Sequence, residues 1–157
     1  MIHLGELASP ALVRGVRGVI FDCDGVMVDS LQANVVFYNW FKEQCGLGPM
    51  DAEEVRYVHA HSVRASLAHI IPEELHGRAE KLRSKIDYRD LLPYIRREPG
   101  LASLLTVLRS QRIRLAVNTN RTTTMELLLD HLGLQCFFSP VVTAGKVSQA
   151  KPHPEGV

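Results

Sequence analysis

The sequence predicts an α/β fold in which a parallel sheet is interrupted by a helical insert. Three observations support this. Two apolar segments, residues 15–21 and 113–118, have the character of buried strands and end in polar side chains. The segment 31–97 between them shows only helical patterns, and from residue 98 onward helices and strands alternate. Alternation of this kind is typical of a parallel sheet with crossover helices.

Composition indicates a globular chain with a small-molecule partner. The 157 residues are 46% hydrophobic and 22% charged, with a formal net charge of +1. Because no basic block runs along the chain, we expect neither nucleic acid nor a membrane surface as a partner. The three cysteines are an odd number without CxxC spacing, which argues against a disulfide framework and a zinc site. With no signal peptide recognisable in residues 1–15, we expect a cytoplasmic protein.

The first strand is predicted from GVRGVIF, residues 15–21. It ends in a continuous apolar run without alternation, as expected of an interior strand that is buried on both faces.

The first helix of the insert is predicted from apolar residues at helical spacing: Leu31, Val35, Tyr38, Phe41 and Cys45. Asp29 and Gln32 suit a capping box at its start, and Gly46 suits its end.

Two further helix starts follow in the insert. Asp51 and Glu54 suit the first of them, and Pro72 precedes the second, which we expect to run to Lys85. The whole segment 31–97 is therefore predicted to be helical.

The chain beyond residue 98 returns to the sheet. One helix is predicted from the apolar face formed by Leu101, Leu104, Leu105 and Leu108. The segment 113–118 is the second strand, and a helix follows it with a capping box of Thr123 and Glu126 and an end at Gly133. We expect a third strand at 136–142.

Polar groups are predicted to collect at one edge of this sheet. Successive strand side chains point to opposite faces, so Asp22 and Asp24 project together while Cys23 points away. The second strand ends in the polar residues 118–120. Ligands of parallel α/β sheets bind beyond the carboxyl ends of the strands. This edge is therefore the predicted site.

Two clustered carboxylates suit a hard cation such as Mg²⁺, which would relieve their repulsion and accept phosphate oxygens as further ligands. An ionised aspartate can also attack phosphorus, while its neighbour handles the leaving-group proton. Such chemistry needs positive charge and donors on the phosphoryl oxygens. Thr119 and Lys151 are the candidates, and Lys146 competes with Lys151 for this role.

Three segments together carry a family resemblance. DCDGVMVDS, residues 22–30, resembles the DxDGxxxDS signature of the haloacid dehalogenase superfamily. LAVNTN is similar to its second motif, an apolar strand that closes on Thr or Ser, and AKPHPEGV is similar to its third. The insert resembles the helical cap of the phosphoglycolate phosphatase-like branch. The resemblance implies a three-layer, Rossmann-like core of residues 1–30 and 98–157 and a cap of residues 31–97.

The resemblance also implies roles for individual residues. Asp22 would be the nucleophile that forms an aspartyl-phosphate, and Asp24 the acid and base, with its backbone carbonyl on Mg²⁺. Thr119 would hold a phosphoryl oxygen, and Lys151 would neutralise the nucleophile and the phosphate. Further candidates for substrate contact are Gly25, Asn120 and the cap residue Arg64. The implied activity is Mg²⁺-dependent hydrolysis of a small phosphomonoester, such as phosphoglycolate or a sugar phosphate.

The chain departs from the family pattern at its end. Members continue to another strand that closes on an acidic pair and completes the Mg²⁺ site, whereas this chain stops at Val157. We therefore expect an incomplete sheet with an uncovered edge at the first strand, and self-association through that edge. Sedimentation as a monomer across micromolar concentrations would contradict the self-association.

Two alternatives stay open. A sugar-phosphate mutase uses the same aspartates to transfer the phosphoryl group to a second hydroxyl. A catalytically silent fragment or pseudoenzyme, acting only by association, would explain the missing acidic pair.

Overall fold

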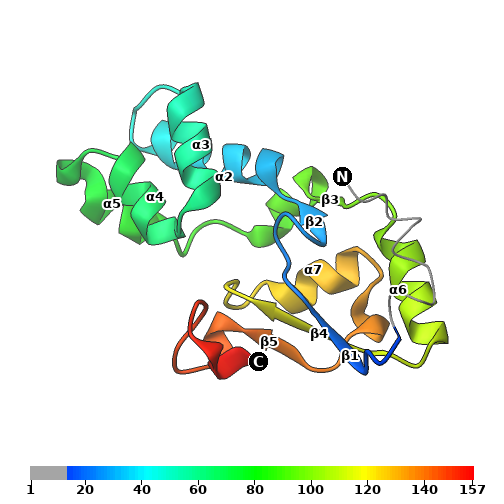
Figure 1. The fold of residues 1–157 in the computed structure, drawn as a ribbon. Helices are drawn as coiled ribbons and strands as arrows, with labels where there is room; N and C mark the ends of the chain where they lie inside the picture. Colours follow the sequence, from blue (N-terminus) through cyan, green and yellow to red (C-terminus); the bar gives the residue numbers. More distant parts are fainter. Residues whose placement is uncertain (1–13) are drawn as a thin grey trace. The chain divides into compact units, whose positions relative to one another are not determined.

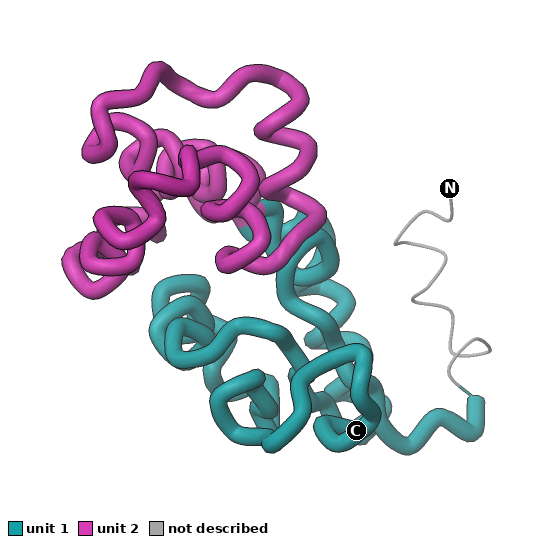
Figure 2. The backbone as a smooth tube through the Cα atoms, turned by 90° about the vertical axis from the view of Figure 1, so that its left-hand side faces the viewer, with its two compact units in different colours: residues 1–29, 97–157 teal, residues 30–96 magenta. Residues whose placement is uncertain are grey.

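The computed structural model describes residues 14–157 and divides into two compact units (Figure 2). The first, here called the core unit, is formed by residues 1–29 and 97–157, and the second, the helical unit, by residues 30–96. These bounds differ by one residue from those of the predicted domains. Residues 1–13 lie outside the described residues. They make up most of the segment 1–15, in which the sequence shows no signal peptide.

The core unit contains a three-stranded parallel sheet in the order β1-β4-β5 (Figure 1). The strands are β1 (Gly18–Phe21), β4 (Arg114–Thr119) and β5 (Val141–Thr143). Phe21 pairs with Val117, and Thr119 pairs with Thr143, so all three strands end at the same edge of the sheet. The predicted α/β class with a parallel sheet is confirmed.

Two helices of the core unit bury apolar faces. In α6 (Leu101–Ser110) the buried residues are Leu101, Leu105 and Leu108, which repeat at the spacing of one helical face. The helix α7 (Met125–His131) buries Met125, Leu128 and Leu129. The predicted helix at 101–108 is therefore present.

Strand β1 lies at the edge of the sheet rather than in its interior. Within residues 14–157 only β4 pairs with it, and the side chain of Ile20 is 49% exposed. The prediction of a strand buried on both faces is wrong for this reason. The uncovered edge that the sequence predicts is present in the described residues, while self-association through it stays a prediction.

Two other sequence predictions for the core unit are wrong. The segment 136–142 is a strand only from Val141, because Gln135–Phe137 form a 3₁₀ turn and Cys136 is exposed. The capping box of α7 does not form. Its N-cap is Thr124, whose hydroxyl makes no capping hydrogen bond to the helix backbone, and Glu126 pairs with Lys146 instead.

The helical unit contains four α-helices among its described residues: α2 (Leu31–Gln44), α3 (Ala52–Ala60), α4 (Val63–Ile70) and α5 (His76–Leu82). Its 3₁₀ segments are Glu73–Leu75 and Tyr88–Tyr94. The expected helix from Pro72 to Lys85 is thus a 3₁₀ turn followed by the shorter α5. Two short strands, β2 (Val28–Asp29) and β3 (Arg96–Arg97), pair where the chain passes between the units.

The predicted helix starts of this unit have different outcomes. The box at α3 is present: the Asp51 carboxylate accepts from the backbone N–H of Glu54, and the Glu54 carboxylate accepts from that of Asp51. The box at α2 is wrong, because Asp29 belongs to β2 and the N-cap is Ser30.

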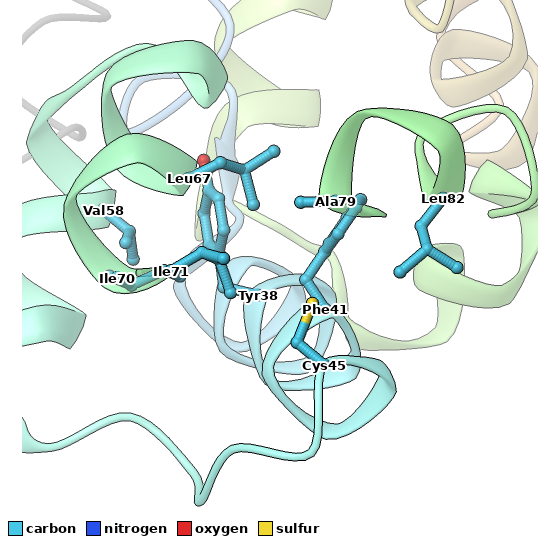
Figure 3. Close-up of a cluster of buried hydrophobic side chains, with 9 residues drawn as sticks. All are labelled: Tyr38, Phe41, Cys45, Val58, Leu67, Ile70, Ile71, Ala79 and Leu82. Carbon is cyan, nitrogen blue, oxygen red and sulfur yellow. The ribbon is translucent and has the colours of Figure 1, made fainter. Parts of the chain in front are cut away.

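A compact apolar cluster holds the helical unit together (Figure 3). Its buried members are Tyr38, Phe41, Cys45, Val58, Leu67, Ile70, Ile71, Ala79 and Leu82. Phe41 is fully buried and meets the rings of Phe37 and Trp40 edge-on, each at 5.0 Å between centroids. Beside the cluster, Lys42 donates to both oxygens of Glu54 at 2.6 and 2.7 Å, so its buried charge is paired. No helix in the described part of the chain is both long and apolar enough to cross a membrane.

Candidate active site

The turn after β1 presents two aspartates on one side. The carbonyl of Cys23 accepts from the N–H of Val28 at 3.1 Å, and the Gly25 N–H donates to the Val28 carbonyl at 2.8 Å. Gly25 has a φ of +74°, which other residues adopt only with strain. The turn leaves the side chains of Asp22 and Asp24 48% and 42% exposed, while Cys23 is fully buried. The expected alternation of side chains is therefore present.

Cys23 has a structural environment rather than a reactive one. Burial raises the pKa of its thiol to about 12, which keeps the sulfur neutral near pH 7. We assign it to packing beneath the two aspartates.

Lys151 lies beside Asp22. Its Nζ is 2.7 Å from Asp22 Oδ1 and donates to the backbone carbonyl of Asn118 at 3.0 Å. The same Oδ1 accepts from the N–H of Cys23 at 2.7 Å. In the described residues both of these contacts are made to Oδ1, which orients the carboxylate. The second oxygen, Oδ2, is therefore the one that can bind or attack a ligand.

The competing lysine is placed elsewhere. Lys146 Nζ donates to Glu126 at 2.5 Å and to the carbonyl of Val141 at 3.0 Å. Those contacts explain its position without a role at the aspartates.

Asp24 is held by an arginine that the sequence analysis missed. Arg121 donates through Nε to Asp24 Oδ2 at 2.9 Å and through a terminal nitrogen to Oδ1 at 2.6 Å, as a two-pronged pair. The arginine side chain is only 13% exposed. Burial works against its charge, but the hydrogen bonds and charge of Asp24 outweigh burial, so the pKa of Arg121 is raised. The sequence signal that could have identified Arg121 is its position: a cationic side chain two residues beyond the end of β4, at the edge of the sheet where Asp24 was expected.

Residues at the end of β4 join these groups. Thr119 is buried, and its hydroxyl accepts from the backbone N–H of Arg121 at 3.2 Å. The side-chain amide of Asn120 donates to the carbonyl of Lys151 at 3.3 Å. One strand end therefore contacts both the arginine that holds Asp24 and the loop that carries Lys151.

The sequence-predicted residues belong to both units. The core unit contains Asp22, Asp24, Gly25, Thr119 and Asn120 at the carboxyl ends of β1 and β4, and Lys151 on the following loop beside Asp22. The N–H of Gly25 is used by Val28, so the backbone of this residue serves the turn. Arg64 is exposed on α4 of the helical unit, and its contact with substrate stays a prediction.

The donor set has a clear chemical character. It combines two carboxylates, two cations and a buried hydroxyl, which suits the binding and reaction of an anionic ester. Among residues 14–157, no three His, Cys, Asp or Glu side chains come together as a group that could hold a metal ion.

Comparison with known proteins identifies relatives of this arrangement. The family model of haloacid dehalogenase-like hydrolases matches residues 19–157. A phosphoglycolate phosphatase of Chromobacterium violaceum is 29% identical over 89% of this chain and 67% of its own. A phosphoglycolate phosphatase of Synechococcus elongatus is 31% identical over 82% and 61%, respectively. The chain therefore spans roughly two thirds of the length of these relatives.

A solved structure agrees in fold. The crystal structure of a haloacid dehalogenase-superfamily hydrolase, subfamily IA, from Geobacter sulfurreducens is 38% identical, with a TM-score of 0.79 over 90% of this chain and 69% of that one. The three motifs, the parallel sheet and the family match lead to one conclusion: the chain belongs to the haloacid dehalogenase-like hydrolase family.

Proposed function

We propose that this protein hydrolyses a small phosphomonoester through an aspartyl-phosphate on Asp22, with Mg²⁺. The observation that carries the proposal is the contact between Lys151 Nζ and Asp22 Oδ1 at 2.7 Å. It places a cation where a dianionic phosphoryl group would approach the carboxylate. The names of the phosphoglycolate phosphatases to which the chain is similar support the reaction class.

The chemistry has two steps. The Asp22 carboxylate attacks phosphorus, and the bond between phosphorus and the ester oxygen breaks, while Asp24 gives its proton to the departing oxygen. Asp24 then takes a proton from a water molecule that attacks the aspartyl-phosphate, which releases inorganic phosphate and restores Asp22. Lys151 offsets negative charge in both steps, and the Thr119 hydroxyl can donate to a phosphoryl oxygen.

Arg121 has a positioning role in this scheme. Its fork engages both oxygens of Asp24, so one of them must be released before that oxygen can carry a proton to the leaving group. The other contact then keeps the carboxyl directed at the ester oxygen.

The residues present fit a magnesium ion. Mg²⁺ is commonly bound by one or two carboxylates and substrate phosphates, with water as the other ligands. The exposed carboxylate of Asp22 and the backbone carbonyl of Asp24 would hold it. When bound, it would neutralise charge between the carboxylate and the phosphate.

We propose phosphoglycolate or a sugar phosphate as the substrate class and the cytoplasm as the compartment. The names of the relatives support phosphoglycolate, and Arg64 is the cap residue proposed to meet the anionic group of the substrate. The compartment is supported by the three free cysteines.

Replacing Arg121 should lower the rate without removing the nucleophile. We expect Arg121→Gln to reduce kcat about 10- to 100-fold, because a misdirected acid loses much of its effect. Arg121→Lys keeps the charge but loses the fork, so it should recover only part of the rate. Steady-state kinetics with p-nitrophenyl phosphate measure both. Wild-type kcat in Arg121→Gln would exclude this role.

The proposed function is tested by phosphate release from phosphoglycolate, a sugar phosphate and p-nitrophenyl phosphate. We expect release with Mg²⁺ and none after chelation. The silent alternative predicts no release above buffer from any ester. Isomerisation of the sugar phosphate without release would favour the mutase.

A further inference from the structure

The loop that carries Lys151 has little regular structure of its own. Residues 144–157 contain two short 3₁₀ turns, Ala144–Lys146 and Pro154–Gly156. A lysine side chain is a flexible stem with a charged end, so its place beside Asp22 depends on how the loop is held.

A single carboxylate closes this loop. Glu155 Oε1 accepts from the N–H of Ser148 at 2.8 Å, and Oε2 accepts from the N–H of Gln149 at 2.9 Å. Lys151 lies between these amides and the glutamate in sequence. The two N–H groups, that of Ser148 first, hold the pKa of Glu155 below its ordinary value, so the carboxylate keeps its charge and its two bonds near pH 7.

The loop is also docked on the end of β4. Asn120 donates to the Lys151 carbonyl, and the Asn118 carbonyl accepts from Lys151 Nζ at 3.0 Å. At Gly156 a β-carbon would lie 2.7 Å from the Asn118 side-chain oxygen, so the backbone next to Glu155 packs directly on that side chain. Gly156, which follows Glu155, is thus in contact with Asn118, the residue whose carbonyl accepts from Lys151.

We infer that Glu155 is a positioning residue that holds Lys151 beside Asp22 by tying the two sides of the 148–155 loop together. The effect of Glu155 on catalysis rests on the proposed function, whereas its effect on the position of the Lys151 side chain does not. Among residues 14–157, Glu155 is the only residue whose side chain accepts from the N–H groups of both Ser148 and Gln149, so the loop depends on this carboxylate.

Glutamine is the appropriate replacement because it keeps the size of the side chain. An amide has one acceptor oxygen, and its NH₂ group can only donate. In Glu155→Gln the N–H of either Ser148 or Gln149 therefore faces the NH₂ group, which is also a donor. One of the two hydrogen bonds that close the loop is lost.

The experiment measures the reactivity of Lys151 with an amine-acetylating reagent, followed by peptide mass spectrometry. In the wild type the amine is held by Asp22 and Asn118. We expect its labelling rate, relative to exposed Lys85, to rise about tenfold in Glu155→Gln as the loop opens locally. Glu126→Gln is the matched control: it should release Lys146 and leave Lys151 unchanged.

The buried thiol of Cys23 reports whether the core unit stays folded. Unchanged Lys151 labelling in Glu155→Gln would overturn the inference. If Cys23 also becomes reactive to a thiol reagent, Glu155→Asp, which keeps the charge on a shorter stem, is measured instead. Exposure of Cys23 in both variants would also overturn it, because Glu155 would then support the whole unit. Since labelling needs no substrate, an inactive chain would refute the proposed function and leave this result standing.

Discussion

Asp22→Asn is expected to abolish phosphate release. The asparagine amide is a poor nucleophile and carries no charge to pair with Lys151, so we expect a loss of at least about a thousandfold in kcat. The fold should persist, because this side chain is half exposed and its shape is kept. Phosphate release with p-nitrophenyl phosphate and Mg²⁺ measures the effect.

A matched control separates the nucleophile from a general loss of charge. Asp130 is an exposed aspartate of the same unit, and its carboxylate accepts from the side chain of Gln135. Asp130→Asn should keep the wild-type rate. Equal rates in Asp22→Asn and Asp130→Asn would remove Asp22 from the mechanism.

Phe41→Ala is expected to have the largest effect on the stability of the helical unit. Its ring is fully buried in the apolar cluster, and truncating such a side chain costs about 3–5 kcal/mol. The measurement is the free energy of unfolding in urea, followed by tryptophan fluorescence. Trp40 is the sole tryptophan of the chain and its ring contacts Phe41, so the signal reports this unit.

The control is Val63→Ala at the start of α4. Val63 is 38% exposed, so we expect a change within about 0.5 kcal/mol. A loss of similar size in both variants would show that the cluster around Phe41 does not dominate the stability of this unit.

Local sequence patterns were sufficient to predict the helices and strands that are determined by interactions between residues close in sequence. The apolar run 113–118 predicted β4 to within a residue, and the spacing of Leu101, Leu104, Leu105 and Leu108 predicted α6. The capping box of Asp51 and Glu54 formed because both partners lie within one turn of α3.

Tertiary contacts decided where the local patterns failed. Glu126 left its expected box for an ion pair with Lys146, twenty residues away, and periodicity could not separate the 3₁₀ turn Gln135–Phe137 from a strand. The edge position of β1 depends on which strands pair with it, which its own apolar sequence does not specify.

The site was predictable in part for the same reason. The alternation of strand side chains placed Asp22 and Asp24 on one side of the turn. The contacts of Arg121 and Glu155 depend on distant partners or on loop closure, so no spacing rule could reveal them. The resemblance to the third motif already favoured Lys151 over Lys146, and in the structure Lys151 lies beside Asp22 while Lys146 pairs with Glu126.

The central claim is that Asp22 becomes covalently phosphorylated. The direct test is to quench the chain during turnover, reduce the acyl phosphate with borohydride and map the modified residue by peptide mass spectrometry. The account predicts reduction of Asp22 to homoserine, only when ester and Mg²⁺ are present. Modification at Asp24 instead, or phosphate release without any modified aspartate, would contradict it.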